Sequence, residues 1–193
     1  MTETLSQTER PLRADARRNR ERILASAREV FAESGVDAQM DDVAQRAGVG
    51  VGTVYRHFPT KEALMVELVR QKFRLFAATA REALERDTEP FDALAYMLRR
   101  NAELCASDAA MQHALSGVGD IWIQARPDQE VLHALSAELV ERAQRAGTMR
   151  LDVGASDIAM LMCGVSSTMA HCGPGFDWRR HLELAIEMLR AAH

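Results

Sequence analysis

The chain has 193 residues, of which 47% are hydrophobic and 27% are charged. This balance is ordinary for a folded protein and excludes wholesale disorder or a fibrous repeat. The formal net charge at pH 7 is -4, and no stretch approaches the roughly 18 apolar residues of a membrane span. Since the N-terminal residues also lack the apolar run of a signal peptide, we expect a cytoplasmic protein.

Charge is distributed unevenly along the chain. Residues 1–61 contain 10 Lys or Arg against 9 Asp or Glu, whereas residues 62–193 contain 14 against 19. Six arginines gather between Arg10 and Arg22, and such a cluster can contact DNA phosphates. It also fits a disordered, solvated arm over residues 1–16. Charge alone does not separate these two interpretations.

Apolar residues at three- and four-residue spacing predict a first helix over about 17–34. Its apolar stripe includes Ile23 and Leu24 early and Phe31 late. Gly35 follows, where helices often end in a left-handed residue. Most of the chain beyond has the same spacing, and no alternating pattern typical of strands occurs. The predicted fold class is therefore all-α.

Two short helices are expected next, at about 40–47 and 51–57, and Pro59 stops the second. Thr60 is a good N-cap for a long helix that reaches about Asp87. Proline and glycine breaks divide the remainder into five further helices, near 90–106, 108–116, 127–146, 155–172 and 177–191.

The two short helices have the features of a helix-turn-helix. Ala44 and Ala47 give the first helix a small apolar face, and Gly48 makes a tight turn. Val49 and Val54 are spaced to fill the junction between the helices. Small, hydroxyl-bearing, aromatic and cationic residues are left to project from the second helix, a mixture suited to contacts with DNA.

The segment DDVAQRAGVGVGTVYRHFPTKEALM, from Asp41 to Met65, resembles the DNA-binding motif of the TetR family of repressors. With the preceding helix included, the resemblance covers about residues 17–65. Beyond that range it is one of helical architecture only. The matching positions are Phe31, Gly35, Ala47, Gly48, Val49, Gly52, Thr53, Val54, Tyr55, Phe58, Lys61 and Glu62.

The sequence departs from the family pattern where the two short helices start. Gln39 and Gly50 replace the usual Ser or Thr there, which weakens capping. The resemblance implies a three-helix helix-turn-helix DNA-binding domain over 17–61 and a helical C-terminal domain for ligand binding and dimerisation over 62–193. It implies a sequence-specific transcription regulator, a repressor that a small molecule releases from its operator.

The resemblance also implies individual DNA contacts, and physical reasoning supports part of them. Arg56 can pair bidentately with a guanine, and Tyr55 can donate its hydroxyl to a phosphate. Lys61 stands at a helix N-terminus, whose dipole also favours phosphate. Tyr55 and His57 alternatively fit a packing role with partial burial. The implied phosphate contacts are Thr53, Tyr55, His57 and Lys61, and the implied base-edge contacts are Val51, Gly52 and Arg56.

A helix-turn-helix of this size reads few base pairs alone, so we expect a homodimer with half-sites roughly 34 Å apart. The last two helices are apolar on more than one face, which resembles the four-helix bundle formed by paired C-terminal helices in the family. The alternative is that both helices lie deep in the core of a single chain. The expected dimer residues are Val165, Met169, Leu182, Ile186 and Leu189.

A small apolar effector is expected in the C-terminal region, where methionines and aromatic residues accumulate. Such side chains suit an adaptable pocket, and they suit a plain core equally well. His113 and Trp122 flank a glycine break and are expected to supply a polar group and an aromatic wall. The expected ligand residues are Met97, Met111, His113, Trp122 and Met162.

Other kinds of site fit the sequence poorly. Gly48, Gly50 and Gly52 follow no strand, which excludes a dinucleotide-binding loop. Cys163 and Cys172 point to opposite sides of one helix, so we expect no metal site. No catalytic motif occurs, and we expect neither an enzyme nor a cofactor. The remaining competitor is a helical binding protein whose helix-turn-helix contacts protein or lipid.

Overall fold

The computed structural model describes residues 6–108, 120–171 and 175–191. Within these ranges the regular elements are helices, apart from an isolated antiparallel bridge between Met149 and Arg190. The all-α fold class is therefore confirmed. The elements are α1 (Ser6–Ser34), η1 (Gly35–Asp37), α2 (Met40–Ala47), α3 (Val51–His57), α4 (Lys61–Glu85), α5 (Pro90–Ala106), α7 (Ile121–Gln124), α8 (Arg126–Arg145), α9 (Ala155–His171) and α10 (Trp178–Met188).

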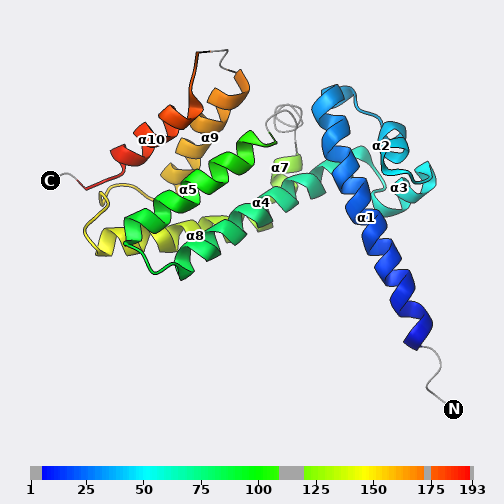
Figure 1. The fold of residues 1–193 in the computed structure, drawn as a ribbon, viewed down its shortest axis with the longest axis horizontal. Coiled ribbons are helices and arrows are strands. Elements are labelled where there is room, and N and C mark those ends of the chain that lie inside the picture. Colours follow the sequence, from blue (N-terminus) through cyan, green and yellow to red (C-terminus); the bar gives the residue numbers. More distant parts are fainter. Residues whose placement is uncertain (1–5, 109–119, 172–174, 192–193) are drawn as a thin grey trace.

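Two groups of helices are joined by α4 (Figure 1). We call α1, α2, α3 and the first half of α4 the head. The second half of α4 packs with α5, α8, α9 and α10, and we call this group the body. Each group has its own cluster of buried hydrophobic side chains. The expected boundary between residues 61 and 62 stays a prediction, because α4 runs through both groups.

The head core is built on the apolar stripe predicted for α1. Ile23, Leu24 and Phe31 are almost fully buried and share one cluster with Val43 of α2 and Val54 of α3. Burial of large apolar side chains is the main stabilising contribution in such a small unit. The three helices are therefore held by a common core.

The first helix begins at Ser6, inside the segment expected to be a disordered arm. Ion pairs one turn apart accompany the early part of the helix, between Asp15 and Arg18 and between Arg17 and Glu21. Such pairs stabilise a solvated helix without any apolar stripe. The apolar spacing that predicts the helix from residue 17 therefore gives no signal for its earlier turns.

The helix-turn-helix has the predicted bounds. α2 ends at Gly48, whose φ of 62° is left-handed, a conformation that glycine adopts without strain. At the end of the motif the Thr60 hydroxyl caps α4, since Oγ1 accepts from the Ala63 backbone N–H at 3.1 Å. The turn chemistry of Gly48 and Thr60 thus fixes both sides of α3.

The long helix α4 belongs to both cores. Leu64 and Leu68 are fully buried in the head cluster, whereas Ala80 and Ala83 are buried in the body cluster. The short helix α7 was not predicted, because four residues give no readable period. Its Ile121 is buried against the head cluster beside α4.

The body helices α5, α8 and α9 match the predicted ranges within about one residue, as expected for helix ends. The predicted helix at 108–116 lies outside the described residues except for Asp108, which is in a turn. The final helix stops at Met188, earlier than expected. Beyond it the Arg150 N–H donates to the Leu189 carbonyl at 3.1 Å and the Ala191 N–H to the Thr148 carbonyl at 3.2 Å. These bonds replace further helical turns.

Candidate nucleic-acid interface

The recognition helix α3 rests on a single buried side chain. Val54 is fully buried, whereas Val51 is 41% exposed and Tyr55 is 47% exposed. Gly52 and Arg56 are exposed too. One face of α3 is therefore open enough to lie in a DNA groove. Four of the seven residues predicted to contact DNA lie on this face.

The other three predicted DNA residues are partly buried. Thr53 and His57 have intermediate exposure, and Lys61 places its Nζ 5.7 Å from the ring centroid of Phe31. The His57 ring lies 6.4 Å from the ring of Phe58. Burial, followed by the charges of Arg56 and Arg20, lowers the pKa of His57. This position fits the packing alternative for His57 and leaves phosphate contact a prediction.

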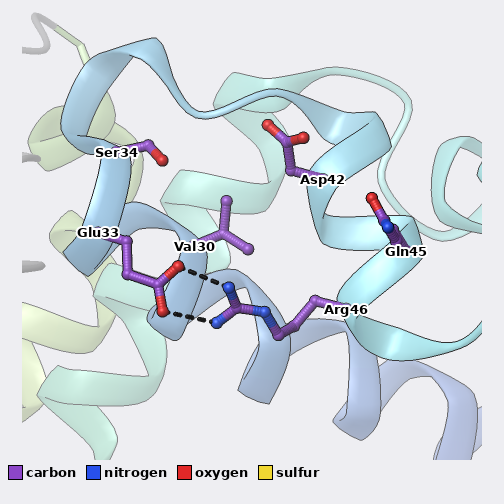
Figure 2. Close-up of a pocket in the computed structure, with 6 residues that line it drawn as sticks. All are labelled: Val30, Glu33, Ser34, Asp42, Gln45 and Arg46. Atoms are coloured by element: carbon purple, nitrogen blue, oxygen red, sulfur yellow. Dashed lines mark hydrogen bonds and ion pairs between the residues drawn. The ribbon is translucent and has the colours of Figure 1, made fainter.

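The helix before the turn is tied to α1 by Arg46. Its guanidinium donates to both carboxylate oxygens of Glu33, at 2.8 and 2.5 Å (Figure 2). It also donates to Glu29 at 3.2 Å. These hydrogen bonds raise the pKa of Arg46 and lower that of Glu33. The bidentate geometry fixes direction as well as distance. The contact holds α2 in one orientation on α1.

Figure 2 also shows the groove beside this ion pair, a cavity of about 390 Å³ between α1 and α2. Asp42 and Glu33 give its lining two carboxylates, and Arg46 is engaged by Glu33. Such a groove repels phosphate, so it supports the head and does not extend the DNA-facing surface.

Sequence reasoning missed the role of two arginines in the basic cluster. Arg22 donates to the carbonyl oxygens of Ala47 and Gly48, at the turn of the motif. Arg20 lies over the Phe58 ring, 5.2 Å from its centroid. Both side chains therefore brace the helix-turn-helix from α1. A basic cluster in the sequence gives no signal that separates this function from phosphate binding.

The N-termini of the two short helices are capped in different ways. Asp42 accepts from the backbone N–H of Gln39 at 3.2 Å, so the start of α2 has the carboxylate half of a capping box despite the atypical Gln. Gly50 provides no side chain to cap α3. The Thr53 N–H instead donates to the Gly50 carbonyl at 2.8 Å.

The residues predicted for the dimer lie largely inside one chain. All five belong to or pack against the body core, and Val165 and Ile186 are almost fully buried. They offer little surface to a second chain. The exposed side of the same two helices carries Met160 (64% exposed), Leu184 (48%) and Met188 (61%). The four buried positions are Val165, Leu182, Ile186 and Leu189, and Met169 is partly buried.

Of the residues predicted for the ligand, Met97 and Met162 lie in or against the body core, whereas Trp122 packs against Phe73. Met97 is buried in the body core and receives a contact from Ser136 Oγ at 3.8 Å. Trp122 is 36% exposed and packs edge-on against Phe73, with 6.2 Å between centroids. Met162 is a partly buried neighbour of the body core. Met111 and His113 lie outside the described residues.

No group of three or more His, Cys, Asp or Glu among the described residues could hold a metal ion. None of the helices described is long and apolar enough to cross a membrane.

Known proteins resemble both parts of the chain. The model of bacterial regulatory proteins of the tetR family matches residues 23–68, and that of the SbtR-like transcriptional regulator C-terminal domain matches residues 89–191. The chain is 38% identical to a TetR transcription regulatory protein from Mycobacterium vanbaalenii, whose crystal structure aligns with a TM-score of 0.68 over 94% of this chain and 100% of that one.

Two further similar proteins are transcription regulators. The HTH-type transcriptional repressor KstR of Mycolicibacterium smegmatis is 40% identical over 101 residues, which are 51% of this chain and 49% of KstR. The match thus spans about half the length of that curated relative. The transcriptional regulator FadR of Bacillus subtilis, solved in complex with stearoyl-CoA, is 19% identical over 90% of this chain and 99% of that one, with a TM-score of 0.76. FadR shows a shared fold.

The helix-turn-helix geometry and the relatives lead to the same assignment. One family model covers the head, a second covers more than half of the chain, and a relative above 30% identity is matched over its whole length. We conclude that the chain belongs to the TetR family of bacterial transcription regulators.

Proposed function

We propose that this protein is a sequence-specific repressor that a small molecule releases from its operator. The observation that carries this proposal is the exposed face of α3, where Val51, Gly52, Tyr55 and Arg56 stand free of the core around the single buried Val54. A helix held from behind by one side chain can enter a major groove. The repressor KstR, similar over half of the chain, supports the direction of regulation.

Within this proposal the residues of α3 have two tasks. Arg56 reads base edges, because an exposed guanidinium can pair bidentately with guanine. Tyr55 donates its hydroxyl to a phosphate and so positions the helix. Thr53, His57 and Lys61 are partly buried, and we propose them as further phosphate contacts.

We infer that two copies bind one operator. The outer face of α9 and α10 exposes Met160, Leu184 and Met188, which a monomer would leave in contact with water. Leu184 and Met188 are four residues apart and therefore lie on one side of α10. Exposed apolar side chains gathered in this way are typical of an interaction surface. A two-fold contact there presents two copies of α3, for half-sites roughly 34 Å apart.

The proposed effector is a small, largely apolar molecule. The fold relative FadR was solved with stearoyl-CoA, so acyl-CoA esters are reasonable first compounds for a screen. Met97, Met162 and Trp122 remain proposed contacts.

A competition assay tests the proposal. Fluorescently labelled DNA from upstream of the protein's own gene is titrated with protein, and unlabelled upstream or shuffled DNA competes at several salt concentrations. A repressor of this kind prefers the upstream sequence and loses affinity as salt rises. Equal competition by shuffled DNA would favour the competing function, in which the helix-turn-helix contacts protein or lipid.

A further inference from the structure

A cavity of about 220 Å³ lies where α1, α4 and α5 meet, at the joint between head and body. Leu75, Phe76 and Leu104 give it an apolar wall. Two cations also line it, Arg28 from α1 and Lys72 from α4. The site therefore combines apolar surface with positive charge. Of the expected effector residues that the structure describes, namely Met97, Trp122 and Met162, none lines it.

The two cations are held in different ways. Arg28 donates to the side-chain oxygen of Gln71 at 2.6 Å, which keeps its guanidinium at the contact of α1 with α4. Lys72 is largely withdrawn from water, and this burial lowers its pKa. Its Nζ lies 5.8 Å from the ring centroid of Phe76. An ammonium in such surroundings has lost part of its hydration, so an additional anion stabilises it.

The described residues that line the cavity include one carboxyl group. Asp108, at the end of α5, also lines the cavity, and burial raises its pKa. It offsets at most one of the two positive charges. The described part of the lining thus holds two cationic side chains and one carboxyl group beside an apolar wall, a combination complementary to an amphipathic anion.

We propose that this cavity binds a small amphipathic carboxylate. The carboxylate lies between Arg28 and Lys72, and the apolar part lies against Leu75, Phe76 and Leu104. Charge-assisted hydrogen bonds to guanidinium and ammonium groups give the site its preference for an anion. The volume is below the roughly 300–1,000 Å³ of pockets for drug-sized ligands, so the ligand is a medium-chain acid or one of similar size.

The position of the cavity makes binding there a means of regulation, and this consequence rests on the proposed function. Arg28 belongs to α1 of the head, and Lys72 belongs to the helix that continues into the body. A ligand that engages both cations favours one arrangement of the joint. If that arrangement differs from the one that fits the operator, the ligand lowers the affinity for DNA, and DNA lowers the affinity for the ligand by the same factor.

Calorimetry on the full chain without DNA tests the binding step. Decanoate is the probe, and n-decanol and decyltrimethylammonium are the neutral and cationic probes with the same chain. We expect decanoate to bind at least about tenfold more tightly than either, as one charged hydrogen bond is enough to produce. Equal binding of decanoate and decanol would overturn the proposal, because it would leave only an apolar groove.

Three variants locate the site. Lys72→Met and Arg28→Met each remove one cation and keep an unbranched side chain. Arg81→Met is the matched control, because the nine residues that separate it from Lys72 turn α4 by about 900° and place it on the opposite side. Thermal denaturation and circular dichroism establish that each variant is folded.

We expect both cavity variants to weaken decanoate binding about tenfold or more, while Arg81→Met leaves it unchanged. Unchanged binding in both folded cavity variants would overturn the proposal even if decanoate binds the wild type, since it would place the acid elsewhere. Loss of sequence-selective DNA binding in the wild type without decanoate would refute the proposed function alone. The two failures are therefore distinguishable.

Discussion

The carboxylate of Glu67 joins α1 to α4 through Arg20, with 3.1 Å between Glu67 Oε1 and Arg20 Nη2. The same oxygen accepts from Arg74 Nη1 at 3.1 Å, and Arg74 Nε donates to Asp128 of α8 at 3.0 Å. Arg20 also covers the Phe58 ring just after α3. One cation–π contact followed by ion pairs therefore connects the end of the recognition helix to the body.

Glu67→Gln tests this connection. The substitution keeps the shape and removes the charge shared by Arg20 and Arg74, so we expect a loss of about 1–3 kcal/mol in the free energy of unfolding. Operator affinity should fall as well, because Arg20 loses the group that holds it over Phe58. Chemical denaturation and operator titration measure both. Glu21→Gln is the control, since its pair with Arg17 is well exposed and such pairs contribute about 0–1 kcal/mol.

Replacement of Arg56 and replacement of Lys61 should change DNA binding in different ways. Arg56→Ala is expected to cost about 1–3 kcal/mol on the true operator and to relax its specificity. Lys61→Ala should weaken all DNA sequences alike and reduce the salt slope by about one. Competition over operator variants at several salt concentrations compares them. If Arg56→Ala weakens operator and random DNA equally, Arg56 contacts phosphate and base reading lies elsewhere.

The lowered pKa of His57 predicts a pH dependence of stability and of operator binding. Because its pKa is lowered in the folded chain, its contribution to stability is present above the ordinary histidine pKa and is lost as pH falls through the lowered value. A phosphate contact would raise that pKa again, so operator binding should take up a proton and strengthen on mild acidification. Operator titrations from pH 5.5 to 8 measure this, with His57→Gln as the reference. A pH dependence that is identical in the variant would leave His57 with packing alone.

The outer face of α10 should control assembly. Leu184→Glu and Met188→Glu change exposed side chains, so we expect a monomer with intact helix content and lost operator binding. Val165→Glu would instead place a carboxylate at a fully buried position and should unfold the chain. Light scattering with circular dichroism separates the cases. A wild-type monomer at micromolar concentration would contradict the proposed dimer.

We expect the buried side chain of Asn101 to lower the stability of the protein. Asn101 is 5% exposed, and its Oδ1 has no hydrogen-bond partner among the residues that the structure describes. An unsatisfied buried acceptor costs about 1–3 kcal/mol, so Asn101→Leu should raise the melting temperature by about 2–4 °C for each kcal/mol recovered. Ser136→Ala is the comparison, because Ser136 Oγ is engaged with Met97 Sδ. A lower melting temperature for Asn101→Leu would show that the amide is satisfied in solution.

The sequence predicted the elements whose ends are set locally. Gly48, Pro59 and Thr60 determine where α2 and α3 end and where α4 begins, and each acts through its own backbone or hydroxyl chemistry. The start of α1 and the end of α10 depend on contacts between residues that apolar spacing does not detect. The short α7 exists because Ile121 reaches the head core, which only the tertiary structure brings near.

The candidate site was predictable to a similar extent. The outward residues of α3 followed from the one inward residue, Val54. The sequence could not tell which apolar face of α9 and α10 turns to the core, because Val165 and Met160 are equally apolar and only packing separates them. The cavity at Arg28 and Lys72 needed three helices to meet, and these residues are far apart along the chain.

Because α4 is buried in the head at one end and in the body at the other, it can act as a lever. Its 25 residues span about 37 Å at 1.5 Å per residue. A tilt of about 5° imposed within the body would move the far end by about 3 Å, and opposite movements in two copies would change the spacing of the recognition helices by about 6 Å, against half-sites roughly 34 Å apart. A displacement too small to disturb either core would thus be enough to move one copy of α3 out of the DNA major groove.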